Sequence, residues 1–117
     1  MRLDHLQLAI PSGSEDANRA FWTGILDCAE MEKPEQLKSR GGVWFLLDGA
    51  EVHLGIETDF RPAKKAHPAL LVTNIDNLAD RLTAAGYAVQ WDESIAGRRR
   101  FFTHDPVGNR IEFIGET

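Results

Sequence analysis

The sequence predicts an α+β fold in which one pattern of strand, helix and further strands occurs twice. The first half reads LDHLQLAI, then a helical stretch that ends in FWTGILD, then GVWFLLDGAEVHLGIE. The second reads AHPALLV, then NIDNLADRLTAAG, then RRFFTHDPVGNRIEFIGE, so that Trp44-Phe45 is matched with Phe101-Phe102. Because an internal repeat constrains architecture more firmly than local propensity, we expect two modules, at about 1–57 and 67–117, joined by a linker at 58–66.

Length and composition indicate that both modules share one domain. The chain has 117 residues, of which 43% are hydrophobic, enough for one core but too few for two independent ones. Its net charge of −5 argues against nucleic acid or an anionic membrane as a general partner. No apolar run approaches the ~20 residues of a membrane helix, and the first residues lack the flanks of a signal peptide, so we expect a cytoplasmic protein. Cys28 is the single cysteine, which leaves His, Asp and Glu as metal ligands.

The first module is predicted to begin with a strand and one helix. Apolar and polar residues alternate from Leu3 to Ile10 with the period of a half-buried strand, and this places His5 and Gln7 opposite the main apolar face. Ser14 is the expected N-cap of an amphipathic helix. The apolar stripe of that helix comprises Ala17, Phe21, Gly24 and Ile25.

The remainder of the first module is predicted to consist mainly of strands. A short edge strand is expected at 28–33, and the polar segment 35–42 is expected to be a loop. Strands at 43–47 and 50–57 surround Asp48-Gly49, a dipeptide that favours a two-residue hairpin turn.

The second module repeats this order. A strand is expected at 67–72, followed by a helix that Asn74 can cap and by a strand at 87–91. A closing hairpin joins 99–103 to 110–114 through a turn in which Asp, Pro and Gly occupy favoured positions. The apolar stripe of the helix comprises Ile75, Leu78, Ala79, Leu82 and Ala85.

Four residues at corresponding places in the two modules carry groups that bind divalent metals. His5 and His67 stand near the starts of the first strands, whereas His53 and Glu112 stand four residues after a glycine that opens each last strand. Strand alternation places them opposite the face that supplies Leu, Ile, Val and Phe. Burying imidazoles and a carboxylate is costly unless they are satisfied, and a bound cation would satisfy them.

Other polar residues on these strands are candidates for substrate binding. Gln7 shares a face with His5 and could orient a water molecule or a substrate oxygen. Glu51 lies two residues before His53 on the same face, so either of the two could face the site. Arg100 or Arg110 could hold an anionic group, because a guanidinium binds carboxylate and phosphate well, although each could instead simply pair with Glu112. His104, near the closing turn, is expected to be exposed.

These segments resemble the vicinal-oxygen-chelate superfamily, which includes glyoxalase I, fosfomycin-resistance transferases, extradiol dioxygenases and bleomycin-resistance proteins. The residues that carry the resemblance are LDHLQLAIP, FWTGIL, AHPALLV and RFFTHDPVGNRIEFI. The likeness covers nearly the whole chain except 35–40 and 59–65. It implies two βαβββ modules with curved mixed sheets that form a funnel-shaped cavity, and helices on the outer face.

The resemblance also implies a divalent ion held by His5, His67 and Glu112, with Glu112, or Glu51 if it reaches the site, as the candidate for proton transfer. His53 is added as a ligand because it is the repeat counterpart of Glu112, whereas glyoxalases carry a Glu on that strand. Nitrogen and oxygen donors without thiolate suit Zn, Ni, Mn, Co or Fe(II). Open positions on the ion would bind adjacent oxygens of a small-molecule substrate.

The function expected from this resemblance is that of a metal-dependent lyase, isomerase or transferase of the glyoxalase or fosfomycin-resistance type. The alternative is a metal-free protein that sequesters a ligand, as bleomycin-resistance proteins do. All three usual ligand positions are occupied here, which favours the enzyme. Extradiol dioxygenases usually carry extra modules, which disfavours ring cleavage. By analogy we expect a homodimer.

Overall fold

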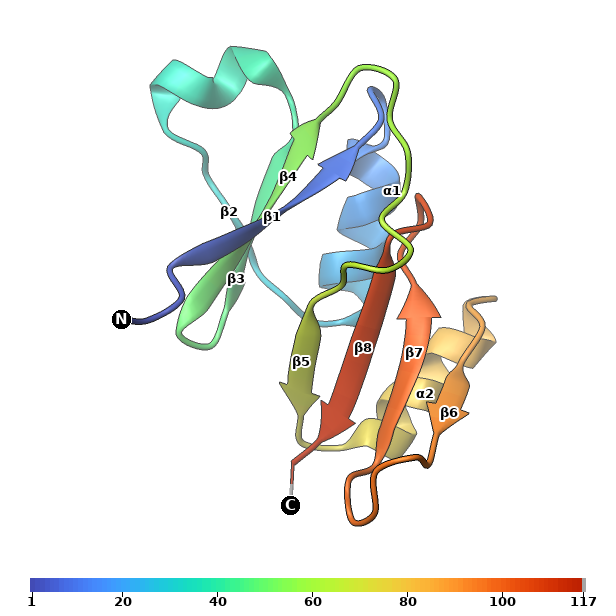
Figure 1. The fold of residues 1–117 in the computed structure, drawn as a ribbon. Helices are drawn as coiled ribbons and strands as arrows, with labels where there is room; N and C mark the ends of the chain where they lie inside the picture. Colours follow the sequence, from blue (N-terminus) through green and yellow to red (C-terminus); the bar gives the residue numbers. More distant parts are fainter. Residues whose placement is uncertain (117) are drawn as a thin grey trace. The chain divides into compact units, whose positions relative to one another are not determined.

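The computed structural model describes residues 1–116, and in this range the chain forms two four-stranded sheets (Figure 1). The chain divides into two compact units: unit 1, Met1–Pro62, and unit 2, which begins at Ala63. Each unit contains one mixed sheet and one main helical segment. The α+β fold made of two repeated modules is therefore confirmed.

Unit 1 contains the sheet with strand order β1-β4-β3-β2, in which β1 and β4 are parallel and the other neighbours antiparallel. Its apolar face carries Val43, Phe45, Val52 and Leu54, all buried. Trp22 of the helical segment lies against this face, because its ring is stacked on Phe45. The elements are β1 (His5–Ile10), α1 (Glu15–Arg19), η1 (Ala20–Ile25), β2 (Glu30–Met31), η2 (Glu35–Arg40), β3 (Val43–Leu47) and β4 (Ala50–Ile56).

The helical segment of unit 1 changes type along its length. The short α-helix α1 continues as η1, a π-helix, whose wider turn joins residues five apart. This turn brings the sequence neighbours Phe21 and Trp22 into the core together, both fully buried and with their rings at 78°. The predicted apolar stripe is consequently wrong at Ala17 and Gly24, which are exposed, while Asn18 is buried.

The segment expected to be a loop, 35–42, instead forms the 3₁₀ helix η2 over its first six residues. Lys38 pairs there with Glu32 and Glu35, at N···O distances of 2.6 and 2.9 Å. The helix ends before Gly41, whose φ of +71° lies in the left-handed region. A polar segment without apolar periodicity gives no helix signal. The ion pairs of Lys38 within this segment are local contacts that such periodicity does not reveal.

Unit 2 contains the sheet with strand order β5-β8-β7-β6, again with a parallel first pair. The helix α2 lies on the sheet face opposite Glu112, since Ile75 contacts Gly115, which shares a face with Phe113 (Figure 1). Its predicted stripe is buried except at Ala85, which is exposed. The elements are β5 (Ala69–Val72), α2 (Ile75–Ala84), β6 (Gln90–Asp92), β7 (Arg100–His104) and β8 (Arg110–Gly115).

The two helix starts are built differently. The Asn74 side chain caps α2, because its Oδ1 accepts a hydrogen bond from the Asn77 backbone N–H at 3.2 Å. Ser14 occupies the N-cap position of α1, but its hydroxyl donates to the Pro11 carbonyl at 2.8 Å and makes no capping bond. The N-cap prediction is therefore confirmed in unit 2 and wrong in its hydrogen bonding in unit 1.

Strand pairing defines how the two modules correspond. His53 pairs with Trp44, and Glu112 pairs with Phe102. If His53 and Glu112 are counterparts, Trp44 corresponds to Phe102, so the predicted match of Trp44 with Phe101 is one residue out. The reason is that the closing hairpin has a longer turn than the two-residue turn in unit 1. Such a shift matters because a register change of one residue exchanges the two faces of a strand.

Among the residues that the structure describes, no helix has the length and apolar character required to cross a bilayer.

Candidate functional site

The polar face of the unit 1 sheet carries a stack of three rings contributed by three adjacent strands. The His53 imidazole lies parallel to the Trp44 indole, with ring centroids 3.5 Å apart and planes at 1°. His5 stacks with His53 at 4.0 Å and 14°. We call Trp44, His53 and His5 the His53 stack. Because the rings are stacked face to face, each imidazole is held with its nitrogen atoms at the edge of the stack.

Each imidazole of the stack is hydrogen-bonded to a carboxylate. His5 Nδ1 lies 2.8 Å from Asp4 Oδ2, and His53 Nε2 lies 2.8 Å from Glu51 Oε1. His53 is 6% exposed, whereas the Glu51 side chain is 31% exposed. His53 and Glu51 lie on the same sheet face. Glu51 contacts the Nε2 atom of the His53 ring, so both side chains are present on this face. Within residues 1–116 the second ring nitrogen of each imidazole makes no hydrogen bond to a protein group.

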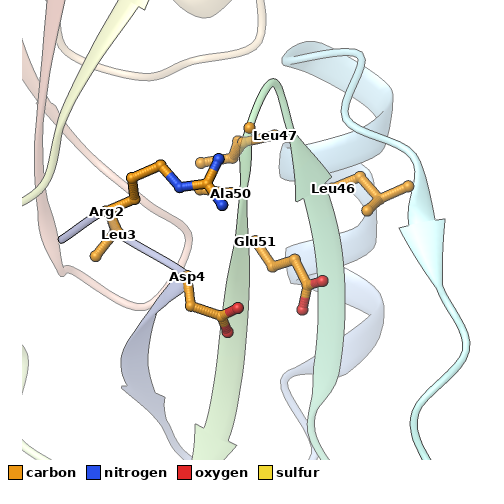
Figure 2. Close-up of a pocket in the computed structure, with 8 residues that line it drawn as sticks. Arg2, Leu3, Asp4, Leu46, Leu47, Ala50 and Glu51 are labelled. Carbon is orange, nitrogen blue, oxygen red and sulfur yellow. The ribbon is translucent and has the colours of Figure 1, made fainter.

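Asp4 and Glu51 also line an open pocket of about 560 Å³ at this end of the sheet. Figure 2 shows their carboxylates directed to the same side, with the Arg2 side chain nearby. The wall is completed by Leu3, which precedes β1, and by residues of the hairpin between β3 and β4, namely Leu46, Leu47, Gly49 and Ala50. The pocket therefore lies beside the groups that hold the two imidazoles of the His53 stack.

Gln7 lies on the same polar face, opposite His53 in the parallel pair of strands. Its side chain lies over Gly55, since a Cβ atom added at Gly55 would overlap the Gln7 amide group. Gly55 thus gives the amide a place close to the sheet. Gln7 is exposed and is therefore accessible to a bound molecule.

In unit 2 the corresponding face is organised around the Phe102 ring. The His67 ring contacts the Phe102 ring edge-on, with centroids 5.4 Å apart. Glu112 is the strand partner of Phe102. The guanidinium carbon atoms of Arg110 and Arg100 lie 4.0 and 5.3 Å from its centroid. We call these five residues the Phe102 cluster. His67 precedes β5 by two residues, so the strand predicted to start at His67 begins later, at Ala69.

Glu112 connects His67 to Arg100. Its Oε1 lies 3.1 Å from His67 Nε2, and its Oε2 accepts a hydrogen bond from Arg100 Nη1, also at 3.1 Å. Arg100 Nη2 donates to the Ser94 hydroxyl at 3.0 Å and pairs with Asp92 at 3.2 Å. The bond to Glu112 is the main cause that raises the pKa of Arg100 above its ordinary value. The charge of Arg100 is therefore already matched by two carboxylates.

Arg110 differs from Arg100 in this respect. Its backbone N–H donates to the Ala63 carbonyl, but in residues 1–116 no side chain accepts a hydrogen bond from its guanidinium. His104, on the neighbouring strand, is exposed as expected. Arg110 is thus the cation of the Phe102 cluster that has no anionic partner.

The four predicted metal ligands form two pairs, one in each unit. Gln7 is the strand partner of His53, and His5 lies two residues before Gln7. Ala69 is the strand partner of Glu112, and His67 lies two residues before Ala69. The pairs therefore occupy equivalent places on their sheets. Within residues 1–116 no group of three or more His, Cys, Asp or Glu side chains is close enough to hold a metal ion.

Several residues at these positions could not be recognised from the sequence. Asp4 is the sequence neighbour of His5, and strand alternation assigns neighbours to opposite faces. It is still able to reach His5, because it lies just before β1, where alternation does not apply. The sequence did not show on which sheet face Trp44 and Phe102 lie. The predicted repeat matched Trp44 with Phe101, whereas strand pairing matches it with Phe102.

Comparison with known proteins agrees with the fold and the repeat. Residues 7–114 match the family model described as a glyoxalase-like domain, a range that includes His53, His67 and Glu112 but not His5. A crystal structure of a protein from Bacillus anthracis, assigned in its name to the glyoxalase family, is 43% identical. It superposes with a TM-score of 0.95 over 100% of this chain and 96% of that one.

More distant structures share the fold. A glyoxalase/dioxygenase from Nostoc punctiforme is 21% identical, with a TM-score of 0.81 over 99% of this chain and 91% of that one. The fosfomycin resistance protein FosX from Listeria monocytogenes is 17% identical, with a TM-score of 0.78 over 100% and 94%. No match is found among curated proteins. The family model and the Bacillus anthracis relative together show that this chain belongs to the glyoxalase-like domain family.

Proposed function

We propose that the protein is a small metal-dependent enzyme of the glyoxalase or fosfomycin-resistance type, acting on a small oxygenated molecule. The observation that carries this proposal is the contact between His67 and Glu112. His67 Nδ1 donates to the Lys65 carbonyl at 2.9 Å, because a carbonyl can only accept. In the neutral ring Nε2 is then an acceptor, yet it lies 3.1 Å from Glu112 Oε1, a second acceptor. Two acceptors so placed need a proton or a cation between them.

The donor set fits a divalent transition metal. His5, His53 and His67 each have one ring nitrogen bonded to an oxygen acceptor, and such an acceptor fixes the ring orientation of an imidazole that binds a metal through its other nitrogen. Imidazole nitrogens and the Glu112 carboxylate are donor types that suit Zn, Ni, Co, Fe(II) or Mn. His53 and Glu112 are each 6% exposed, so an unmet polar group there is costly.

The roles of the residues follow from these contacts. When bound, the ion would supply a Lewis acid that polarises adjacent oxygens of the substrate. Glu112 is the candidate base: Arg100 fixes its Oε2, and Oε1, on the side of His67, is the oxygen that would accept a proton. Gln7 would orient a substrate oxygen, and Glu51 would hold the ring of His53. A homodimer is part of the proposal and is supported by the superfamily resemblance alone.

The first test is the metal content of protein purified without chelator and reconstituted with Zn, Ni, Mn, Co or Fe(II). We expect stoichiometric binding by the wild type and a loss of affinity of at least ~10-fold in His67→Ala, since one ligand is removed. His104→Ala is the matched control, because this exposed histidine lies at the end of β7, outside the predicted ligand set, and should leave the affinity unchanged. A wild type that binds no metal after reconstitution would favour the metal-free, ligand-sequestering alternative.

The same assay distinguishes His53 from Glu51. We expect His53→Ala to weaken metal affinity more than Glu51→Ala, because Glu51 is assigned to orient the ring rather than to bind the ion. The reverse order would make Glu51 the ligand.

A further inference from the structure

The two arginines of the Phe102 cluster share one ring but not one environment. Arg100 is held by Glu112, Asp92 and Ser94, and its side chain is 15% exposed. Its Nε is buried and has no acceptor within residues 1–116, so it is not open to an incoming group. Arg100 is therefore built into the protein and is not available for an external anion.

Arg110 has the opposite properties. Its guanidinium carbon lies 4.0 Å from the centroid of the buried Phe102 ring, a distance at which cation and ring attract each other. The ring covers part of the guanidinium and contributes no hydrogen-bond acceptor. Within residues 1–116 the N–H groups of the Arg110 guanidinium thus have no hydrogen-bond acceptor, while the side chain is partly withdrawn from water. An oxyanion is the ligand that fills them best, because the guanidinium fork matches two oxygens of one group.

The position of Arg110 connects it to the proposed reaction site. Arg110 and Glu112 are two residues apart on β8 and therefore share a sheet face. The same Phe102 ring contacts His67 edge-on. An anion on Arg110 would therefore lie beside the candidate base and one candidate ligand. Glu112 itself does not serve as the anion, since its oxygens are directed to His67 and Arg100.

We propose that Arg110, supported by the Phe102 ring, is the binding site for an anionic group of the substrate, a carboxylate, phosphonate or phosphate. This inference rests on the proposed function for the identity of the ligand as a substrate. It names the substrate class: a small molecule that carries an oxyanion in addition to the oxygens presented to the metal. Arg100 has the different role of fixing Glu112.

The test uses metal-free protein, so that anion binding is measured apart from metal binding. Inorganic phosphate is titrated into the full chain while the arginine Nε–H signals are followed by ¹⁵N NMR. We expect a saturable shift of the Arg110 signal, and a loss of phosphate affinity of about 10-fold or more in Arg110→Met, as expected for a charge-assisted hydrogen bond. Arg98→Met removes an exposed arginine just before β7 and should leave the phosphate affinity unchanged.

Other results would overturn the proposal. Phosphate that shifts Arg98 as strongly as Arg110, or that binds Arg110→Met as well as the wild type, would show only general attraction to positive charge. The wild-type shift is diagnostic even if Arg110→Met folds poorly. Arg110→Lys keeps the charge but loses the planar fork, and we expect intermediate affinity. Reconstitution of the same variants with metal, in a separate assay, reports on the proposed metal site.

Discussion

At the scale of single residues, the His53 stack shows how side-chain packing can prepare a polar group for binding. Trp44 covers one face of the His53 ring and His5 covers the other, so the imidazole cannot rotate without breaking both contacts. Glu51 then determines which ring nitrogen is engaged. A buried histidine with a fixed ring plane and one engaged nitrogen has a defined direction for its remaining donor, which is what metal binding requires.

Gly42 is the residue at which a small change should be most harmful to stability. Its φ is +84°, and an added Cβ would overlap the backbone oxygen of Leu54, which is fixed in β4. We expect Gly42→Ala to lower the free energy of unfolding by about 2 kcal/mol or more, because backbone strain and steric overlap add. Chemical denaturation measures this change.

Gly24 provides the matched control for that substitution. It lies in η1, its φ is not positive, and nothing within 4 Å would meet an added Cβ. Gly24→Ala should change the free energy of unfolding by less than about 1 kcal/mol, or raise it slightly. Equal losses of stability in the two variants would contradict the assigned cause, which is the overlap of an added Cβ at Gly42 with the Leu54 backbone oxygen.

At the scale of elements, period-two alternation predicted the sheet faces well, and helical spacing predicted α2. The face of β4 that carries Glu51 and His53 was identified correctly, because strands with one apolar face have a simple signal. The π-helical turn of η1 was not predictable, since it depends on placing both Phe21 and Trp22 in the core. The offset between modules arose from a turn length, which local pattern does not reveal.

The two helix starts allow a direct test of what capping contributes. Asn74 makes the side-chain bond to Asn77 at the start of α2, whereas Ser14 makes no such bond to α1. We expect Asn74→Ala to reduce the free energy of unfolding by about 1 kcal/mol, and Ser14→Ala to reduce it by less. Thermal or urea unfolding of the two variants gives the comparison. A larger loss in Ser14→Ala would mean that its bond to Pro11 matters more than a cap.

At the scale of the whole molecule, the repeat places one pair of predicted metal ligands in each unit. Each unit supplies one histidine near its first strand and one ligand from its last strand, at equivalent register positions. The repeat in the sequence predicted these four residues as ligands, and the structure places them at equivalent register positions. The sequence could not identify the groups that hold them, such as Asp4, because those contacts depend on loops and strand ends.

The contact between His67 and Glu112 within unit 2 predicts that these two residues act on the same metal ion. His67→Ala and Glu112→Gln should each weaken affinity for Zn²⁺ by ~10-fold or more. The double variant should lose less than the sum of the two free-energy changes, because residues that bind one ion are coupled. Titration calorimetry with Zn²⁺ measures these affinities. Strictly additive losses would mean that His67 and Glu112 do not bind the same ion, and the role proposed for their contact would then have to be abandoned.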